Sequence, residues 1–316
     1  MQKLKILTLG CNSILGFNFA KNILKNKKII FYGTINKNSY RLNTDPLTRK
    51  LSNIKKYNPI LHSKKLIKIL NNFQPNIVIN FIGSSDLFIK SKKEHDSQNF
   101  NTLKNIFNSI NLSNTNIKHF FNMGSAQEYR NSLKHSVKES YSLNPITDYA
   151  KSKVKCHKYG AKWGTKNNIK FTTLRVFNVI GNDQFKKNIF IKLIRLKPNE
   201  KIVLHQFNAV RDYIFINDFI SILIKLILNY NKINYNVINI GAGVPIKMSY
   251  LIKSMSRLLK RDLINNIIIN NKLNTHSNSN YANIDRLKKI IHIKKLKTVD
   301  EILKILIKNN DKLNNL

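Results

Sequence analysis

At 316 residues and 36.8 kDa the chain can bury a large core, and we expect a nucleotide-binding domain with a smaller lobe rather than one α/β domain with insertions. The net charge of +39 would favour a nucleic-acid partner if Lys and Arg were clustered, but they are spread from end to end, which argues against a specific one. Two cysteines are too few for a disulfide framework, and no apolar run approaches the roughly 18 residues that cross a bilayer. We therefore expect a cytoplasmic protein that does not span a membrane.

Short apolar runs alternate with helix-length segments along the first part of the chain. A helical pattern runs from Ile14 to Leu24. Strands are predicted at Lys5–Gly10, Ile29–Thr34, Ile77–Gly83, Phe120–Ser125 and Phe171–Val179. Strand, helix and strand at this spacing predict the α/β class, with a doubly wound parallel sheet of the Rossmann type.

The pattern becomes less regular beyond Gly181. It predicts a strand at Lys201–His205, a helix at Ile216–Leu228, a strand at Val237–Gly241, a loop at Asn265–Asn280 and a closing helix at Val299–Ile307. We expect residues 1–178 to form the Rossmann domain. Residues 179–316 would form mainly a smaller C-terminal lobe, with residues 205–241 returning to the Rossmann sheet.

A glycine-containing loop lies between the first predicted strand and the first predicted helix. Gly10 can make the tight turn, Gly16 lets the helix pack closely on the strand, and backbone N–H groups at the helix start can face a pyrophosphate. Ser13 stands where the pattern has a middle glycine, and a serine is small enough to serve. We expect Gly10, Ser13, Ile14, Leu15 and Gly16 to contact a dinucleotide, the alternative being a plain strand-to-helix turn.

The end of the second predicted strand carries no acidic residue. In dinucleotide-binding folds an Asp or Glu there binds the ribose hydroxyls of NAD. This chain instead has Asn36 and Lys37, an uncharged and then cationic corner that suits a 2′-phosphate. We therefore expect NADP, with NAD as the alternative, and Asn36, Lys37 and Arg41 as candidate contacts.

A phenol and an ammonium share one face of a predicted helix, since Tyr149 and Lys153 are four residues apart. A phenol, with an ordinary pKa of about 10, is a poor base at neutral pH, and an adjacent ammonium favours the phenolate. Ser125 ends a predicted strand, at the edge where doubly wound sheets bind ligands. The pattern predicts a catalytic set of Ser125, Tyr149 and Lys153.

These motifs resemble those of the extended short-chain dehydrogenase/reductase family, whose members act on nucleotide sugars as epimerases, dehydratases and reductases. Four further segments are similar to the family's motifs in order and spacing: Asn99–Phe107, Arg175–Gly181, Arg211–Asp218 and Asn239–Gly243. The similarity covers nearly the whole chain. It implies a nicotinamide-dependent enzyme with a nucleotide-diphosphate sugar as substrate.

The resemblance also implies the roles of the site residues. Tyr149 would exchange a proton with the sugar hydroxyl or carbonyl, and Ser125 would hydrogen-bond the same oxygen. Lys153 would lower the pKa of Tyr149 and hold the nicotinamide ribose. Arg211 would bind the diphosphate, the alternative being a local ion pair with Asp212. Further implied contacts are Phe81, Ile82, Gly83, Asn99 and Val179 to the cofactor, and Ser84, Ala126, Gln127, Asn178 and Asn188 to the substrate.

The residues after Ser125 bear on the reaction. Dehydratases of the family carry Asp-Glu or Ser-Glu there, whereas this chain has Ala126 and Gln127, and a carboxamide cannot accept a proton as a carboxylate does. Two alternatives remain for the reaction. One is reduction of a nucleotide-linked 4-keto-6-deoxyhexose by NADPH, and the other is 4-epimerisation with bound NAD. The missing second-strand acid, and the similarity of Gln206–Asp212 to GDP-6-deoxymannose reductases, favour reduction.

Two further expectations concern chemistry and assembly. A non-catalytic nucleotide-binding module is a third alternative, although a complete Ser125, Tyr149, Lys153 set argues against it. The family resemblance implies a homodimer that pairs through the helices at Asn99–Ile110 and Tyr149–Trp163. We expect no metal site.

Overall fold

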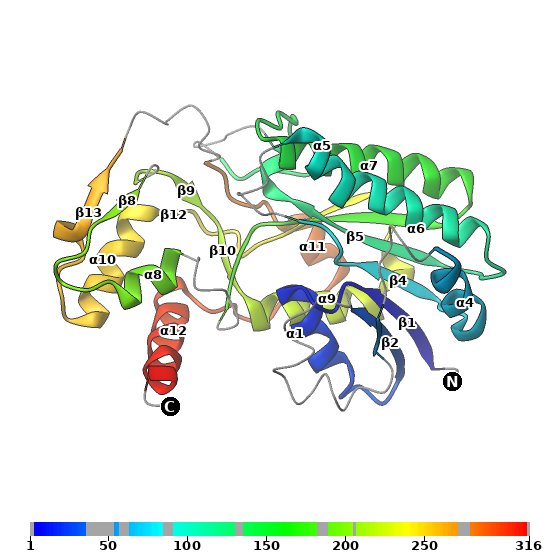
Figure 1. The fold of residues 1–316 in the computed structure, drawn as a ribbon, viewed down its shortest axis with the longest axis horizontal. Helices are drawn as coiled ribbons and strands as arrows, with labels where there is room; N and C mark the ends of the chain where they lie inside the picture. Colours follow the sequence, from blue (N-terminus) through cyan, green and yellow to red (C-terminus); the bar gives the residue numbers. More distant parts are fainter. Residues whose placement is uncertain are drawn as a thin grey trace. The chain divides into compact units, whose positions relative to one another are not determined.

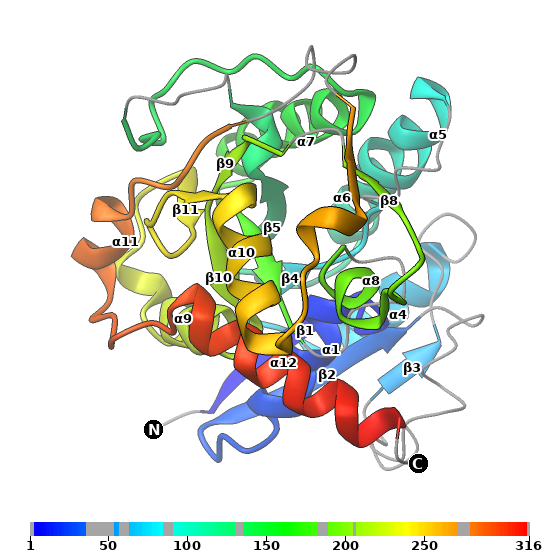
Figure 2. The same ribbon diagram turned by 90° about the vertical axis from the view of Figure 1, so that its left-hand side faces the viewer.

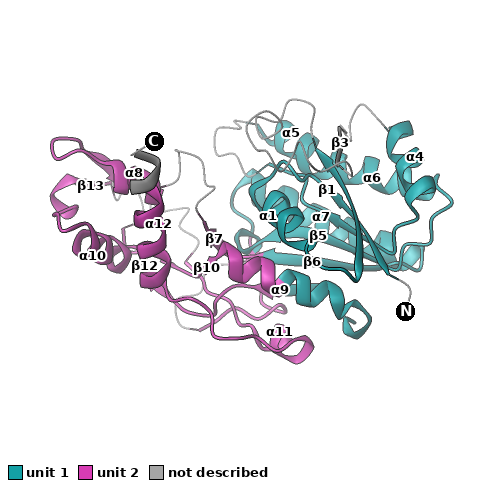
Figure 3. Ribbon diagram, turned by 90° about the horizontal axis from the view of Figure 1, so that it is seen from below, with its two compact units in different colours: residues 1–128, 145–175, 223–238 teal, residues 129–144, 176–222, 239–316 magenta. Residues whose placement is uncertain are grey.

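The computed structural model describes residues 3–35, 54–56, 63–84, 91–129, 135–181, 189–204, 207–270 and 279–314. The predicted contacts Asn36, Lys37, Arg41 and Asn188 lie outside these ranges. The chain forms two compact units (Figure 3). The first consists of residues 1–128, 145–175 and 223–238, and the second of residues 129–144, 176–222 and 239–316.

A seven-stranded sheet forms the centre of the first unit, in the order β11-β6-β5-β4-β1-β2-β3 (Figure 1). The strands are β1 (Leu4–Leu9), β2 (Ile29–Ile35), β3 (Ile54–Lys56), β4 (Ile77–Asn80), β5 (His119–Ser125), β6 (Lys170–Val176) and β11 (Val237–Ile240). The ladders of β1 with β2 and β4, of β2 with β3 and of β4 with β5 are parallel. The chain builds outward from β1 to β3 and then returns to β4 on the other side of β1. This order confirms the predicted doubly wound α/β sheet.

The helices of the first unit cover this sheet with amphipathic faces. They are α1 (Ile14–Ile23), α4 (Ser63–Phe73), α5 (Lys92–His95), the π-helical η1 (Asp96–Asn101), α6 (Thr102–Asn111) and α7 (Asp148–Lys166), with short 3-10 turns η2 (Ala126–Glu128) and η3 (Tyr230–Lys232). On α6, Leu103, Ile106, Phe107 and Ile110 recur at helical spacing and are buried. Phe107 stacks on Trp163 of α7, with ring centroids 3.9 Å apart. Burial of such side chains contributes about 1.5–3 kcal/mol each and fixes α6 against α7.

The second unit contains short strands and helices. They are β7 (Asn178–Ile180), α8 (Ile189–Arg195), β8 (Ile202–Leu204), β9 (Val210–Arg211), β10 (Tyr213–Phe215), β12 (Ile246–Lys247), α10 (Met248–Leu259), η4 (Ile264–Asn266), β13 (Ile267–Ile269), α11 (Asp285–Ile290) and α12 (Val299–Asn314). The helix α9 (Ile216–Leu228) runs from this unit into the first. α12 packs against α8 and α10 (Figure 2). The closing helix α12 ends at Asn314 and is longer than the predicted Val299–Ile307.

Two predicted elements are wrong in detail. The run Phe171–Val179 is not one strand, because the Phe177 N–H bonds the Ile240 carbonyl whereas the next N–H, that of Asn178, bonds the Asp212 carbonyl. The chain thus leaves one sheet for another at Phe177. The predicted loop Asn265–Asn280 contains β13, where three consecutive isoleucines pair in parallel with β8.

Two further findings limit the kinds of site that the described residues contain. None of the described helices combines the length and the apolar character that crossing a bilayer requires. Within the same ranges, no group of three or more His, Cys, Asp or Glu side chains is placed to hold a metal ion.

Candidate active site

Two glycines of the loop between β1 and α1 are required by close backbone contacts. Gly10 has a φ of +87°, and a Cβ atom there would lie 2.9 Å from the backbone nitrogen of Ile82. A Cβ atom on Gly16 would lie 2.4 Å from the carbonyl oxygen of Gly10. Any side chain at either position would therefore push the loop away from the strand ends.

Ser13 caps the first helix of the sheet. Its Oγ accepts a hydrogen bond from the Gly16 N–H at 3.0 Å and donates one to the Gly10 carbonyl at 3.0 Å. A serine cap of this kind stabilises a helix by about 1 kcal/mol. It leaves the N–H groups of Ile14 and Leu15 without an acceptor inside the helix, as in every first helical turn. These two N–H groups and the positive end of the helix dipole fit a pyrophosphate, so the loop suits a dinucleotide.

The loop is held to the neighbouring strand by a residue that the sequence did not point out. The Thr34 hydroxyl accepts from the Gly10 N–H at 3.4 Å, and the Thr34 carbonyl accepts from the Cys11 N–H at 2.8 Å. The Cys11 side chain is fully buried, and burial raises the pKa of its thiol to about 12. The Cys11 thiol is therefore buried and not ionised at neutral pH. Cys11 lies between the predicted contacts Gly10 and Ser13 in the sequence.

The chain after β4 brings together three predicted cofactor contacts. Gly83 has a φ of +151°, and a Cβ atom there would lie 2.5 Å from Asn99 Oδ1 and 3.1 Å from Lys153 Nζ. Phe81 begins this segment, and its N–H donates to the Leu9 carbonyl at 2.8 Å. The absence of a side chain at Gly83 is what lets the catalytic-helix lysine approach the end of β4.

Asn99 uses its side-chain amide to join the end of β4 to α7. Its Oδ1 accepts from the Ser84 N–H at 3.0 Å, and its Nδ2 donates to the Ser84 carbonyl at 3.2 Å and to Ser152 Oγ at 3.0 Å. All of these groups lie within the first unit. The predicted cofactor contact Asn99 and the predicted substrate contact Ser84 are thus also partners of each other.

The three predicted catalytic residues come from β5 and from the first turns of α7. Thr147 caps α7, because its Oγ1 accepts from the Ala150 N–H at 3.1 Å, and the same hydroxyl donates to Gln127 Oε1 at 3.3 Å. The Gln127 N–H in turn donates to Ser125 Oγ at 3.2 Å. The start of α7, where Tyr149 lies, is therefore tied to the turn that carries Ser125.

Lys153 is tied to the same strand. Its Nζ donates to the Met123 carbonyl at 2.9 Å and lies 5.8 Å from the centroid of the Tyr149 ring. Lys153 is 8% exposed, whereas Tyr149 is half-buried. An ammonium in a buried setting beside a phenol is the electrostatic arrangement that proton transfer by tyrosine needs.

A buried ion pair lies directly beneath Ser125, and sequence reasoning missed it. Glu128 Oε1 accepts from the Ser125 N–H at 2.8 Å, while Glu128 Oε2 accepts from Arg175 Nε at 2.9 Å. The Glu128 and Arg175 side chains are 0% and 2% exposed. The only signal in the sequence was an arginine within the apolar run at Phe171–Val179. Because both carboxylate oxygens are engaged, Glu128 orients the Ser125 turn and is not placed to act as a base.

Three of the predicted substrate and cofactor residues lie in the second unit. Asn178 and Val179 are on β7, and the Asn178 N–H and Nδ2 both donate to the Asp212 carbonyl, at 3.1 and 2.9 Å. Arg211 is on β9. Asn178 and Arg211 both adjoin Asp212, the first through these two hydrogen bonds and the second through the chain itself.

Asp212 is a structural centre of the second unit. Its carboxylate accepts from the N–H groups of Ala242 at 2.7 Å, Gly243 at 2.9 Å and Ala282 at 3.0 Å. Complete burial raises the pKa of Asp212 to about 6, even though the three N–H groups act in the opposite direction. Asp212 thus holds the turn after β11 next to the strand that carries Arg211.

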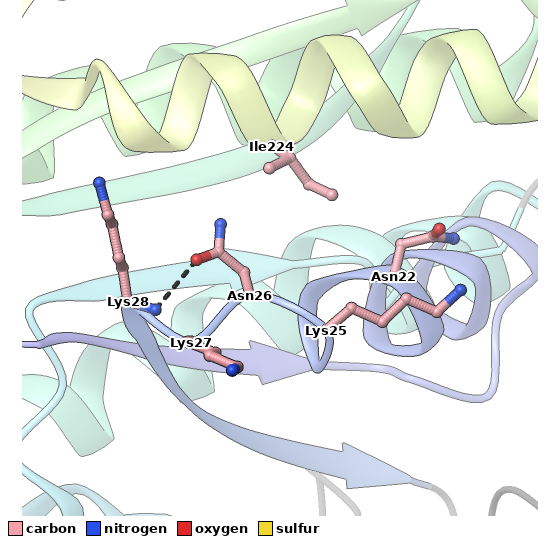
Figure 4. A pocket seen from close by; sticks show the side chains of 6 residues that line it. All are labelled: Asn22, Lys25, Asn26, Lys27, Lys28 and Ile224. Atoms are coloured by element: carbon pink, nitrogen blue, oxygen red, sulfur yellow. Dashed lines mark hydrogen bonds between the residues drawn. The ribbon is translucent and has the colours of Figure 1, made fainter.

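A pocket of about 400 Å³ opens elsewhere on the first unit (Figure 4). Its lining residues are Asn22, Lys25, Asn26, Lys27, Lys28 and Ile224. The Lys28 carbonyl accepts from the Leu4 N–H, so this pocket lies where β1 and β2 begin. Gly10 directly follows β1, and Ser125 is the last residue of β5, so both lie at the end of the parallel sheet opposite to this pocket. The pocket is therefore separate from the catalytic set.

Residues 6–241 match the NAD dependent epimerase/dehydratase family. The chain belongs to this family. The match confirms the predicted family and the prediction of a nicotinamide-dependent enzyme. No curated protein sequence matches the chain.

Solved structures with the same fold include members with different activities. UDP-glucuronic acid 4-epimerase from Bacillus cereus, in complex with UDP-glucuronic acid and NAD, is 16% identical with a TM-score of 0.83 and covers 98% of this chain and 100% of its own. UDP-N-acetylglucosamine 4-epimerase from Methanobrevibacter ruminantium is 19% identical with a TM-score of 0.82 and covers 99% and 100%. RMD from Pseudomonas aeruginosa, complexed with NADPH, is 15% identical with a TM-score of 0.79 and covers 99% of both chains.

Proposed function

We propose that this protein uses NADPH to reduce the 4-keto group of a nucleoside-diphosphate-linked 4-keto-6-deoxyhexose. The observation that carries the proposal is that hydrogen bonds tie the start of α7, which bears Tyr149 and Lys153, to the end of β5, which bears Ser125, in a member of a nicotinamide-dependent family. A neighbour of the same fold was solved with NADPH bound, which supports the choice of cofactor.

The roles of the catalytic residues follow from their positions. The bound cofactor would supply a hydride to carbon four of the sugar. Tyr149 would then give its hydroxyl proton to the substrate oxygen, and the Ser125 hydroxyl would hold that oxygen by a hydrogen bond. Lys153, which lies beside both the phenol and the Met123 carbonyl, would stabilise the phenolate that remains and hold the nicotinamide ribose.

The binding roles complete the proposal. Gly10, Ile14 and Leu15 would hold the pyrophosphate of the cofactor, and Asn36 and Lys37 its 2′-phosphate. Arg211 would hold the diphosphate of the substrate, because a guanidinium forms two parallel hydrogen bonds to such an oxyanion. The remaining substrate contacts would be Ser84, Ala126, Gln127, Asn178 and Asn188.

Dehydration is disfavoured by the residues that follow Ser125. Elimination requires a base, and the side chain at position 127 is a carboxamide whose oxygen accepts a hydrogen bond from Thr147. The next carboxylate along the chain, that of Glu128, is bonded to Arg175 and to the Ser125 N–H. Reduction and epimerisation need no base for elimination and require, besides the cofactor, the proton-transfer tyrosine.

The second candidate function is 4-epimerisation of a nucleotide sugar with tightly bound NAD. It is supported by the 4-epimerases among the structural neighbours, one of which was solved with NAD. The same Ser125, Tyr149 and Lys153 set serves both reactions. They differ in whether the cofactor is consumed.

An assay of cofactor consumption tests the proposal. The protein is incubated with NADPH and a panel of nucleotide-linked 4-keto-6-deoxyhexoses, and NADPH absorbance is followed, with Tyr149→Phe as the inactive control. Oxidation of NADPH by the wild type alone is expected. No oxidation with any sugar of the panel would overturn reduction, and conversion of a UDP-hexose to its 4-epimer without net NADPH use would establish the second candidate.

The proposal includes a homodimer that pairs through the helical segments at Asn99–Ile110 and Tyr149–Trp163. Within one chain, these segments pack against each other through Phe107 and Trp163. Sedimentation equilibrium at micromolar concentration should give twice the chain mass. A monomer would refute this part of the proposal without affecting the chemistry.

A further inference from the structure

A buried imidazole lies against the ring of the catalytic tyrosine. His95 ends α5, is 6% exposed, and its ring centroid lies 6.1 Å from that of Tyr149 with the two planes tilted by 55°. Its Nδ1 atom is buried and has no hydrogen-bond partner in the part of the chain that the structure describes. Nδ1 of His95 is therefore a hydrogen-bonding atom, on a ring that contacts Tyr149, that the described residues leave unused.

The helical geometry explains why His95 faces Tyr149. His95 and Asn99 are four residues apart on α5 and η1, which places them on one face. Asn99 bonds Ser152 of α7, and Tyr149 lies three residues before Ser152 on the facing helix. The two helices thus meet along two matched pairs. The pair that contains the predicted proton-transfer residue consists of His95 and Tyr149.

An unpartnered nitrogen in such a place indicates a ligand. Leaving a buried polar atom unbonded is unfavourable, so most such atoms in folded proteins find a partner. Nδ1 of a neutral imidazole is a donor or an acceptor, depending on the tautomer, and a hydroxyl group can be its partner in either case. Other polar groups near the catalytic tyrosine are bonded within the protein, as shown by Lys153 to Met123 and Asn99 to Ser152.

We propose that His95 is a substrate-binding residue that hydrogen-bonds the sugar hydroxyl next to the reacting carbon. The proposal rests on the proposed function, in which Tyr149 meets the oxygen on carbon four. On a 4-keto-6-deoxyhexose, carbon five carries the ring oxygen and the methyl group, so the adjacent hydroxyl is that on carbon three. His95 then makes the enzyme specific for sugars that keep this hydroxyl.

The test compares His95→Phe and His95→Gln with the wild type, each on a 3-hydroxy substrate and its 3-deoxy analogue. Phenylalanine keeps the ring contact with Tyr149 and deletes both nitrogens, while glutamine restores a donor and an acceptor. We expect His95→Phe to raise KM about tenfold for the 3-hydroxy sugar and less than about twofold for the 3-deoxy sugar. His95→Gln should recover part of that loss. The Kd for NADPH should not rise and the Tm of the ligand-free protein should not fall, since Nδ1 has no partner among the described residues.

The possible failures are distinguishable. An equal rise in KM on both sugars would show that His95 has a packing role. A lower Tm of ligand-free His95→Phe would show that His95 makes a structural hydrogen bond. Either result overturns the proposal. Wild-type kinetics in His95→Phe would overturn it while leaving the proposed function intact. Calorimetric titration with the same two sugars covers the case without turnover. If the wild type binds neither sugar, both the proposed function and the proposed role of His95 are refuted.

Discussion

Replacing Glu128 with Gln removes the charge from a carboxylate that is bonded on both sides. The change leaves the Arg175 guanidinium, with a side chain 2% exposed, as a buried cation without its counter-charge. Breaking a buried pair from one side costs about 3–5 kcal/mol. Because glutamine keeps the shape and one acceptor, we expect the free energy of unfolding to fall by about 3 kcal/mol, the lower end of that range. The Ser125 N–H loses its charged acceptor as well, so kcat should also fall.

Urea denaturation of a double-mutant cycle measures this pair. Glu128→Gln, Arg175→Met and the double variant are compared with the wild type, and we expect a coupling energy of at least about 1.5 kcal/mol because removal of both charges leaves neither uncompensated. The matched control is Lys151→Met, which breaks the exposed pair of Lys151 with Asp148 and should cost less than about 1 kcal/mol. Additivity of the two single losses within about 0.5 kcal/mol would refute the reasoning.

Three further perturbations test the site and the fold. Tyr149→Phe should lower kcat about 100-fold or more while leaving the Kd for NADPH within about twofold, and retained turnover would exclude Tyr149 as the proton donor. Gly16→Ala places a Cβ atom 2.4 Å from the Gly10 carbonyl, so calorimetry should show cofactor binding weakened about tenfold or more, and unchanged binding would contradict the assigned loop. Burial lowers the pKa of His119 from 6.5 to about 3. The unfolded state therefore takes up the extra proton, and stability that is present above pH 6.5 is lost as pH falls, by about 2 kcal/mol between pH 7 and 5. Urea titrations should show this loss in the wild type and not in His119→Gln, and equal pH dependence would disprove it.

Local patterns were sufficient for the parts of the site that depend on short spacing. Gly10 and Gly16 are needed for contacts within one turn, and Tyr149 and Lys153 share a face because of helix periodicity. Such features are encoded within a few residues of each other. The strand ends that carry Gly10 and Ser125 follow from the parallel sheet, which the alternation of strands and helices predicted.

Features that depend on distant partners could not be predicted in this way. Glu128 and Arg175 are 47 positions apart, and the sequence around either residue does not predict that the other is its partner. His95 lies 54 positions before Tyr149 and meets it only because α5 packs on α7. The break at Phe177 has the same origin, since its neighbours bond to two different sheets.

The two buried thiols give each half of the catalytic apparatus its own reporter. Cys11 lies in the glycine loop and Cys156 on α7, both are free, and burial raises the pKa of each to about 12. An alkylating reagent reaches neither while the fold is closed, since it requires an accessible thiolate. The labelling rate of Cys11 therefore measures how often the phosphate-binding turn opens in solution, and that of Cys156 how often the helix that bears the proton donor opens. A bound dinucleotide would slow the labelling of Cys11, and no engineered probe is needed.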